Sequence, residues 1–133
     1  MNIRILILLT IICFSASGCF VLLVGGAGAY VGTQYVNGVL FYDVRHPVSQ
    51  VHEASLMALR DLDLLIMDDD ISQREALVKF EYDDGKWGRI QIKAITEKVS
   101  SVKIRIGTLG NEEKATAVRK ALGKYLEEIE RVD

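Results

Sequence analysis

Residues 76–108 read ALVKFEYDDGKWGRIQIKAITEKVSSVKIRIGT, a stretch in which apolar and charged side chains alternate in three successive segments. Alternation with a period of two is typical of a β-strand that is buried on one face. The three segments are residues 76–82, 87–95 and 100–108, and the Asp-Gly pair at 84–85 favours a tight turn between the first two. They predict an antiparallel meander with an apolar inner face and a charged outer face.

The segments on either side of this meander predict two helices and two further strands. Residues 36–44 are β-branched and aromatic, which favours a strand, and Pro47 opens a predicted helix that ends near Asp61 and has Leu62 on its apolar face. Residues 64–67 are expected to form a short apolar strand, which ends at the three aspartates Asp68, Asp69 and Asp70. Asn111 is the expected N-cap of a final helix. The order β-α-β-β-β-β-α predicts an α+β two-layer sandwich, with both helices on one face of an antiparallel sheet.

The composition divides the chain sharply. It has 133 residues, a net charge of −2 and 34 charged side chains, of which 33 lie between Asp43 and Asp133, while residues 5–42 carry none. About 90 residues suffice for one small core. A net charge near zero argues against a nucleic-acid-binding protein, which needs a basic surface.

The N-terminus has the anatomy of a secretory signal. Residues 1–4 contain one positive side chain, residues 5–14 are an apolar core, and Ala16-Ser17-Gly18-Cys19 follows. That tract resembles the lipobox of bacterial lipoproteins, which implies cleavage before Cys19 and acylation of that cysteine. We therefore expect a signal peptide at 1–18, a lipidated, membrane-proximal segment at 19–35 and a domain at 36–133.

Two alternatives concern the same region. The uncharged run Ile5–Val24 is long enough to cross a bilayer as an uncleaved, single-pass anchor. After it, Gly25, Gly28 and Gly32 have spacings that favour close helix–helix association in membranes, or else a flexible tether. Phe20 follows Cys19 where an aspartate would favour retention in the inner membrane, so the outer membrane is expected in a Gram-negative host.

Residues with catalytic or metal-binding chemistry do not form a recognisable motif. His46 and His52 are six residues apart across a predicted strand–helix junction, so they lack the spacing of a zinc pair. The aspartates at 68–70 are consecutive, whereas a calcium loop alternates its ligands. The sequence predicts no enzyme, no cofactor and no metal site.

The outer face of the meander is the candidate binding surface. Its cations are Lys79, Arg89, Lys93, Lys103 and Arg105. A basic surface at a membrane can contact anionic lipid headgroups, cell-wall polymers or an acidic protein. The alternative is a solvated outer face, on which long side chains cover the sheet.

The lipobox, the Gly/Ala-rich segment, HPVSQVHEASLMALRDLDL and VKIRIGTLGNEE together resemble a family of small bacterial lipoproteins known only as a domain of unknown function. The resemblance covers nearly the whole chain and implies location and fold, but no catalytic or ligand residues. We expect a non-enzymatic, lipid-anchored envelope protein with a binding or structural role. The second hypothesis is a single-pass membrane-anchored accessory subunit of an envelope complex.

Overall fold

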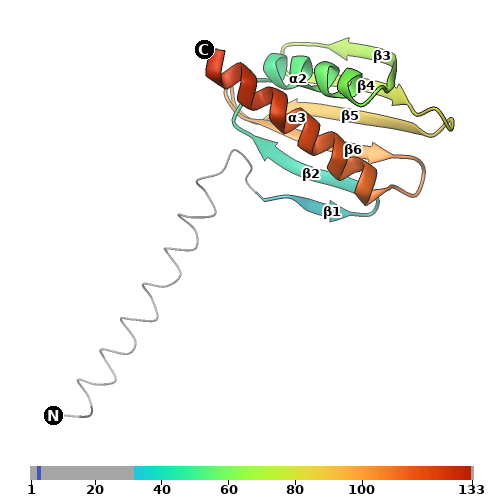
Figure 1. The fold of residues 1–133 in the computed structure, drawn as a ribbon. Coiled ribbons are helices and arrows are strands. Elements are labelled where there is room, and N and C mark those ends of the chain that lie inside the picture. Colours follow the sequence, from blue (N-terminus) through green and yellow to red (C-terminus); the bar gives the residue numbers. More distant parts are fainter. Residues whose placement is uncertain (1–2, 4–31, 133) are drawn as a thin grey trace.

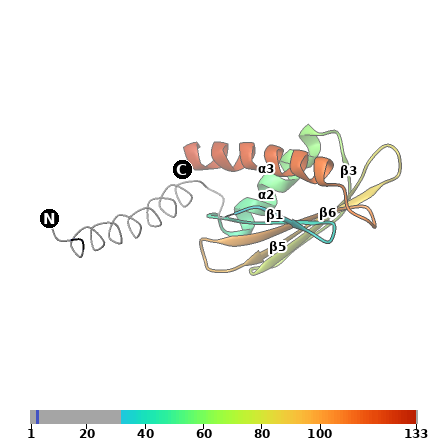
Figure 2. The same cartoon turned by 90° about the horizontal axis from the view of Figure 1, so that it is seen from below.

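The alternating segments form the centre of a six-stranded antiparallel sheet in a computed structural model, which describes residue 3 and residues 32–132 (Figure 1). Its elements are β1 (Gln34–Val36), β2 (Val39–Val44), α2 (Val48–Asp61), β3 (Leu65–Ile71), β4 (Glu75–Glu81), β5 (Trp87–Ala94), β6 (Ser100–Ile106) and α3 (Glu112–Val132). The order across the sheet is β1-β2-β6-β5-β4-β3. Both helices cover the same face (Figure 2), which confirms the predicted α+β two-layer fold.

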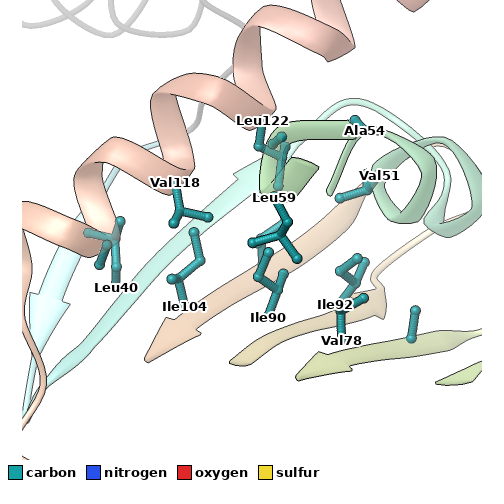
Figure 3. Packing of buried hydrophobic residues seen from close by; sticks show 14 of the residues in the cluster. Leu40, Val51, Ala54, Leu59, Val78, Ile90, Ile92, Ile104, Val118 and Leu122 are labelled. Atoms are coloured by element: carbon teal, nitrogen blue, oxygen red, sulfur yellow. The ribbon is translucent and has the colours of Figure 1, made fainter. Parts of the chain in front are cut away.

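The core lies between that covered face and the helices. The buried apolar side chains of β2, β4, β5 and β6 point toward α2 and α3, and Figure 3 shows Ile90, Ile104 and Leu59 meeting between the two layers. All three side chains are fully buried. Burial of apolar area contributes about 25 cal/mol per Å² to folding, so this single layer of contacts is the main source of stability.

The predicted first strand is divided by a tight turn. Asn37 and Gly38 both have positive φ angles, 52° and 81°, and they join β1 to β2 as a two-residue hairpin. An Asn-Gly pair suits this turn because both residues tolerate the left-handed region. The β-branched residues around the pair had favoured one continuous strand from 36 to 44 instead.

The first predicted helix begins and ends where expected, but Leu62 lies outside it. The carbonyl of Pro47 accepts hydrogen bonds from the backbone N–H groups of Gln50 and Val51, so the proline lies just before the first turn. Leu62 is the C-cap residue and is 37% exposed, so its predicted place on the buried face was wrong. Once the helix has ended, its 3.6-residue period no longer sets the direction of the next side chain.

β3 continues through the aspartates that were expected to end it. The strand runs to Ile71, with an irregularity in register between Ile66 and Asp68, and it forms one edge of the sheet. Three carboxylates suit an edge strand, because charge opposes pairing with the edge of another sheet.

The final helix begins as predicted. The side-chain oxygen of Asn111 accepts a hydrogen bond from the backbone N–H of Lys114 at 3.0 Å, which is an N-cap contact. Within residues 32–132 neither helix is long and apolar enough to cross a membrane.

Candidate functional site

The candidate surface is the face of the sheet that α2 and α3 leave uncovered. Residues that pair across neighbouring strands share a face, and successive residues alternate between faces. Because the paired residues Val78 and Ile90 are fully buried under the helices, their neighbours Lys79 and Arg89 project from the opposite side. The same reasoning places all five predicted cations on the uncovered face.

Three of these cations form a row across the centre of the sheet. Lys79 on β4 pairs with Arg89 on β5, and Arg89 pairs in turn with Arg105 on β6. Adjacent strands lie about 4.7–4.9 Å apart, and like charges directly opposite one another are destabilising. The row is therefore a position where an anion would lower the electrostatic cost of the fold.

The remaining two cations belong to neighbouring rows. Lys103 pairs with Gln91, and its ammonium lies 5.4 Å from the centre of the Phe41 ring, a cation–π contact. Lys93 pairs with Ser101 on one side and with Glu75 on the other.

Local contacts hold the ends of the row. The Lys79 ammonium lies 3.6 Å from a carboxylate oxygen of Asp68 on the edge strand. The Arg105 guanidinium donates a hydrogen bond to the carbonyl of Thr108 at 2.5 Å. The ion pair is exposed and contributes little to stability, so its main effect is to orient the lysine.

Acidic side chains border this basic centre. On the uncovered face the central strands β5 and β6 carry Arg89, Lys93, Lys103 and Arg105, whereas the acids lie on the flanking strands. The acids, which the strand pairing places on this face, are Asp43, Asp68, Asp70, Glu75 and Glu81. The result is a basic centre with an acidic rim, and not a uniformly basic surface.

Trp87 adds an aromatic group beside the row. Its side chain is 42% exposed, and it lines a shallow hollow of about 360 Å³ together with Met67, Lys79 and Arg89. Glu81 also lines this hollow, so two cations, one carboxylate, one indole and one thioether offer charged and apolar contacts side by side.

The two histidines lie apart and have different partners. His46 is buried, and its Nδ1 lies 3.0 Å from the side-chain oxygen of Gln50. His52 projects from α2, and its Nε2 lies 2.5 Å from a carboxylate oxygen of Asp69 on β3. The contact between His52 and Asp69 was not predicted from the sequence, because the aspartates were expected to end the strand before Asp69. In residues 32–132 no group of three metal-ligating side chains forms a metal site.

A second polar cluster fastens the β4–β5 hairpin to α3. The Lys114 ammonium lies 4.2 Å from the centre of the Tyr82 ring and 3.6 Å from an Asp84 carboxylate oxygen. Burial, together with the Asp84 charge, raises the pKa of the Tyr82 hydroxyl. A hydrogen bond from the backbone N–H of Lys86, helped by the charge of Lys114, lowers the pKa of Asp84. These contacts have a structural role, since they hold the hairpin against the start of the helix.

Cys19, Gly25 and Gly28 lie outside the described residues, whereas Gly32 lies within them, with an exposed backbone and a φ of 67°. The predictions of lipidation at Cys19 and of association through the three glycines therefore stay predictions.

The fold defines a small α+β domain with two helices on one face of its sheet and the other face uncovered. Residues 2–124 match the model of the family described as "Protein of unknown function (DUF3568)", and the chain belongs to that family. A search of the curated proteins finds no match.

Proposed function

We propose that the chain is a bacterial lipoprotein that the lipid on Cys19 holds at the cell membrane, and that its domain has a binding or structural role instead of an enzymatic one. The charged n-region, the ten-residue apolar core and the small residues before Cys19 support this proposal. Several acyl chains on one residue give stable membrane retention, whereas one chain gives only marginal binding. Phe20 favours the periplasmic side of the outer membrane if the host is Gram-negative.

The proposed contact surface is the basic centre of the uncovered face, and its proposed ligand is an anionic component of the envelope. The observation that carries this proposal is the pairing of Arg89 with Arg105 on the two central strands. A phosphate or carboxylate placed between two guanidinium groups accepts charge-assisted hydrogen bonds from both, and it removes the repulsion between them. The acidic rim would keep such a ligand over the centre.

The first experiment tests the membrane anchor. The intact mass of the membrane-extracted protein should show the loss of residues 1–18 and the addition of acyl chains, and Cys19→Ser should abolish both changes. Labelling of cells with a palmitate analogue should fall to background in the same variant. An unprocessed chain, or unchanged labelling of Cys19→Ser, would contradict the lipoprotein and favour the single-pass accessory subunit with Ile5–Val24 as its anchor.

The second experiment tests the surface. Replacing Lys93, Lys103 and Arg105 together with Gln should lower binding to anionic vesicles or envelope fractions. The matched control replaces Lys120, Lys124 and Arg131 of α3 with Gln, which changes the net charge equally on the opposite side of the sheet. Equal binding by the two triple variants would leave only a solvated outer face.

A further inference from the structure

One end of the sheet exposes several large apolar side chains. At this end the β4–β5 hairpin and the β6–α3 loop lie together, as both views of the fold show (Figures 1 and 2). Leu109 in the loop is 91% exposed, and Leu65 and Met67 on β3 are 63% and 58% exposed. Isolated apolar residues are common on protein surfaces, whereas a group at one end indicates a contact site.

Trp87 lies at the centre of this group. Its indole borders two hollows, one of about 360 Å³ shared with Met67 and Arg89, and one of about 460 Å³ shared with Leu109 and Lys86. Leu65 belongs to the same row of the uncovered face, because it pairs with Glu81, which pairs with Trp87. Leu65, Met67 and Leu109 therefore surround one corner of the molecule, with Trp87 between them.

Cations adjoin the apolar group. Arg89 and Arg105 lie one row further into the uncovered face than Trp87, and Lys86 immediately precedes it in the hairpin. Of the acids nearby, the Asp84 carboxylate lies 3.6 Å from the Lys114 ammonium, and Glu81 of the acidic rim pairs across the strands with Trp87. Exposed Leu and Trp side chains beside Arg and Lys are the combination that a membrane interface binds, since the apolar groups enter the acyl boundary and the cations meet phosphates.

The number of residues between Cys19 and the domain is large enough to let this corner reach a bilayer. Fourteen residue steps separate Cys19 from Thr33, and an extended chain spans at most about 3.3–3.6 Å per step, or about 50 Å. The longest strand, β5, has eight residues and is about 27 Å long. A domain held at Cys19 can therefore turn its hairpin end toward the membrane surface.

We propose that the corner formed by Leu65, Met67, Trp87 and Leu109 rests on the surface of an anionic lipid bilayer. Leu109 and the Trp87 indole enter the boundary between headgroups and acyl chains, and Arg89 and Arg105 bind lipid phosphates. This inference rests on the proposed anchor, and it identifies the proposed anionic ligand as a lipid headgroup.

The test uses Trp87, which is the only tryptophan of the chain, as its probe. The full, membrane-extracted protein is reconstituted into vesicles of phosphatidylethanolamine and phosphatidylglycerol with bromine on the acyl chains. Trp87 emission should shift to shorter wavelength and be quenched relative to the same vesicles without bromine. Leu109→Glu should lower the quenching by about two-fold or more, because a carboxylate does not enter the acyl boundary.

The matched control is Val132→Glu, which adds the same charge at a residue that is 87% exposed at the far end of α3. Twenty-one helical residues place that position about 30 Å from Leu109. Quenching should be unchanged in this variant. As a second probe, Trp87→Phe combined with Leu109→Trp should be quenched at the new position.

The outcomes separate this inference from the anchor. Protein that does not float with the vesicles contradicts the proposed lipid anchor. Protein that floats while Trp87 stays unquenched overturns the inference alone. That result is expected if the natural partner of this corner is an acidic protein and not lipid. Quenching that Leu109→Glu leaves unchanged overturns it as well, and equal quenching without phosphatidylglycerol overturns the role given to the arginines.

Discussion

Gly88 on β5 leaves the space that the ring of Phe80 on β4 fills. The two residues pair across the strands, and a β-carbon added to Gly88 would lie 2.4 Å from ring atoms Cε2 and Cζ of Phe80. The same carbon would lie 3.0 Å from Cδ1 of Ile106. Carbon atoms pack best at about 3.5–4.0 Å, so Gly88→Ala creates an overlap of more than about 1 Å with a ring that is 1% exposed.

Two opposing effects set the size of the destabilisation. Overpacking a buried site costs about 1–3 kcal/mol, because neighbouring side chains must leave their preferred rotamers. Replacing glycine with alanine also recovers about 0.4–1 kcal/mol by restricting the unfolded chain. We expect Gly88→Ala to lower the free energy of unfolding by about 1.5 kcal/mol, which for a domain of this size lowers Tm by about 6–12 °C.

The assay is urea unfolding of the full chain in a mild non-ionic detergent, followed by circular dichroism and by Trp87 fluorescence. A double-mutant cycle isolates the cause, because Phe80→Leu removes the ring atoms that the new methyl would overlap. In that background Gly88→Ala should be neutral or stabilising, so the coupling energy should exceed about 1 kcal/mol. Costs that add within about 0.5 kcal/mol would refute the explanation by overlap.

Three further predictions concern the hairpin end of the domain. Gly110→Ala should be strongly destabilising in thermal unfolding, because Gly110 has a φ of 82°, which alanine rarely adopts. The added β-carbon would also lie 2.4 Å from the Cα of Gly38, a backbone atom that can move only if the chain around it shifts. Asn111→Ala should cost about 1 kcal/mol through loss of the N-cap, and Asn111→Asp should restore most of it in the same urea titration. The folded state lowers the pKa of Asp84 below its ordinary value of 3.8. The ionised carboxylate therefore stabilises the fold at pH values above 3.8, and this stability is lost as the pH falls through the folded-state pKa. Urea titrations from pH 7 to acid should therefore show Asp84→Asn less stable than the wild type at neutral pH, with the difference closing below about pH 3.8; a constant difference would contradict this assignment.

Much of the candidate surface was already visible in the alternation of residues 76–108. A period of two assigns each side chain of a strand to a face, so the outward direction of Lys103 and Arg105 followed once Ile104 was assigned to the core. The structure confirms that burial pattern, with Val102, Ile104 and Ile106 all buried. The Asn111 cap was predictable for the same reason, because an N-cap contact involves only residues within one turn of the helix.

The positions of residues relative to distant segments were not predictable in this way. β2 lies beside β6, although β3, β4 and β5 come between them along the chain. The pairing of Arg89 with Arg105 depends on the register between two strands, and the contact of His52 with Asp69 depends on how α2 crosses the edge strand. Registers and crossings are set by how the core packs as a whole, which a local period does not encode.

The sequence by itself determined the positions of the two helices and of the strands of the meander. It also determined which side chains of these strands are buried and which are charged and point outward. Those properties depend on local geometry, because strand and helix periods act over only a few residues. The tertiary structure alone decided that the cations form a row beside Trp87, that Leu109 lies across a hollow from that indole, and that acids border the centre. These are relations between segments that are distant along the chain, and only the packing of the two helices on the sheet brings them to one face and one end.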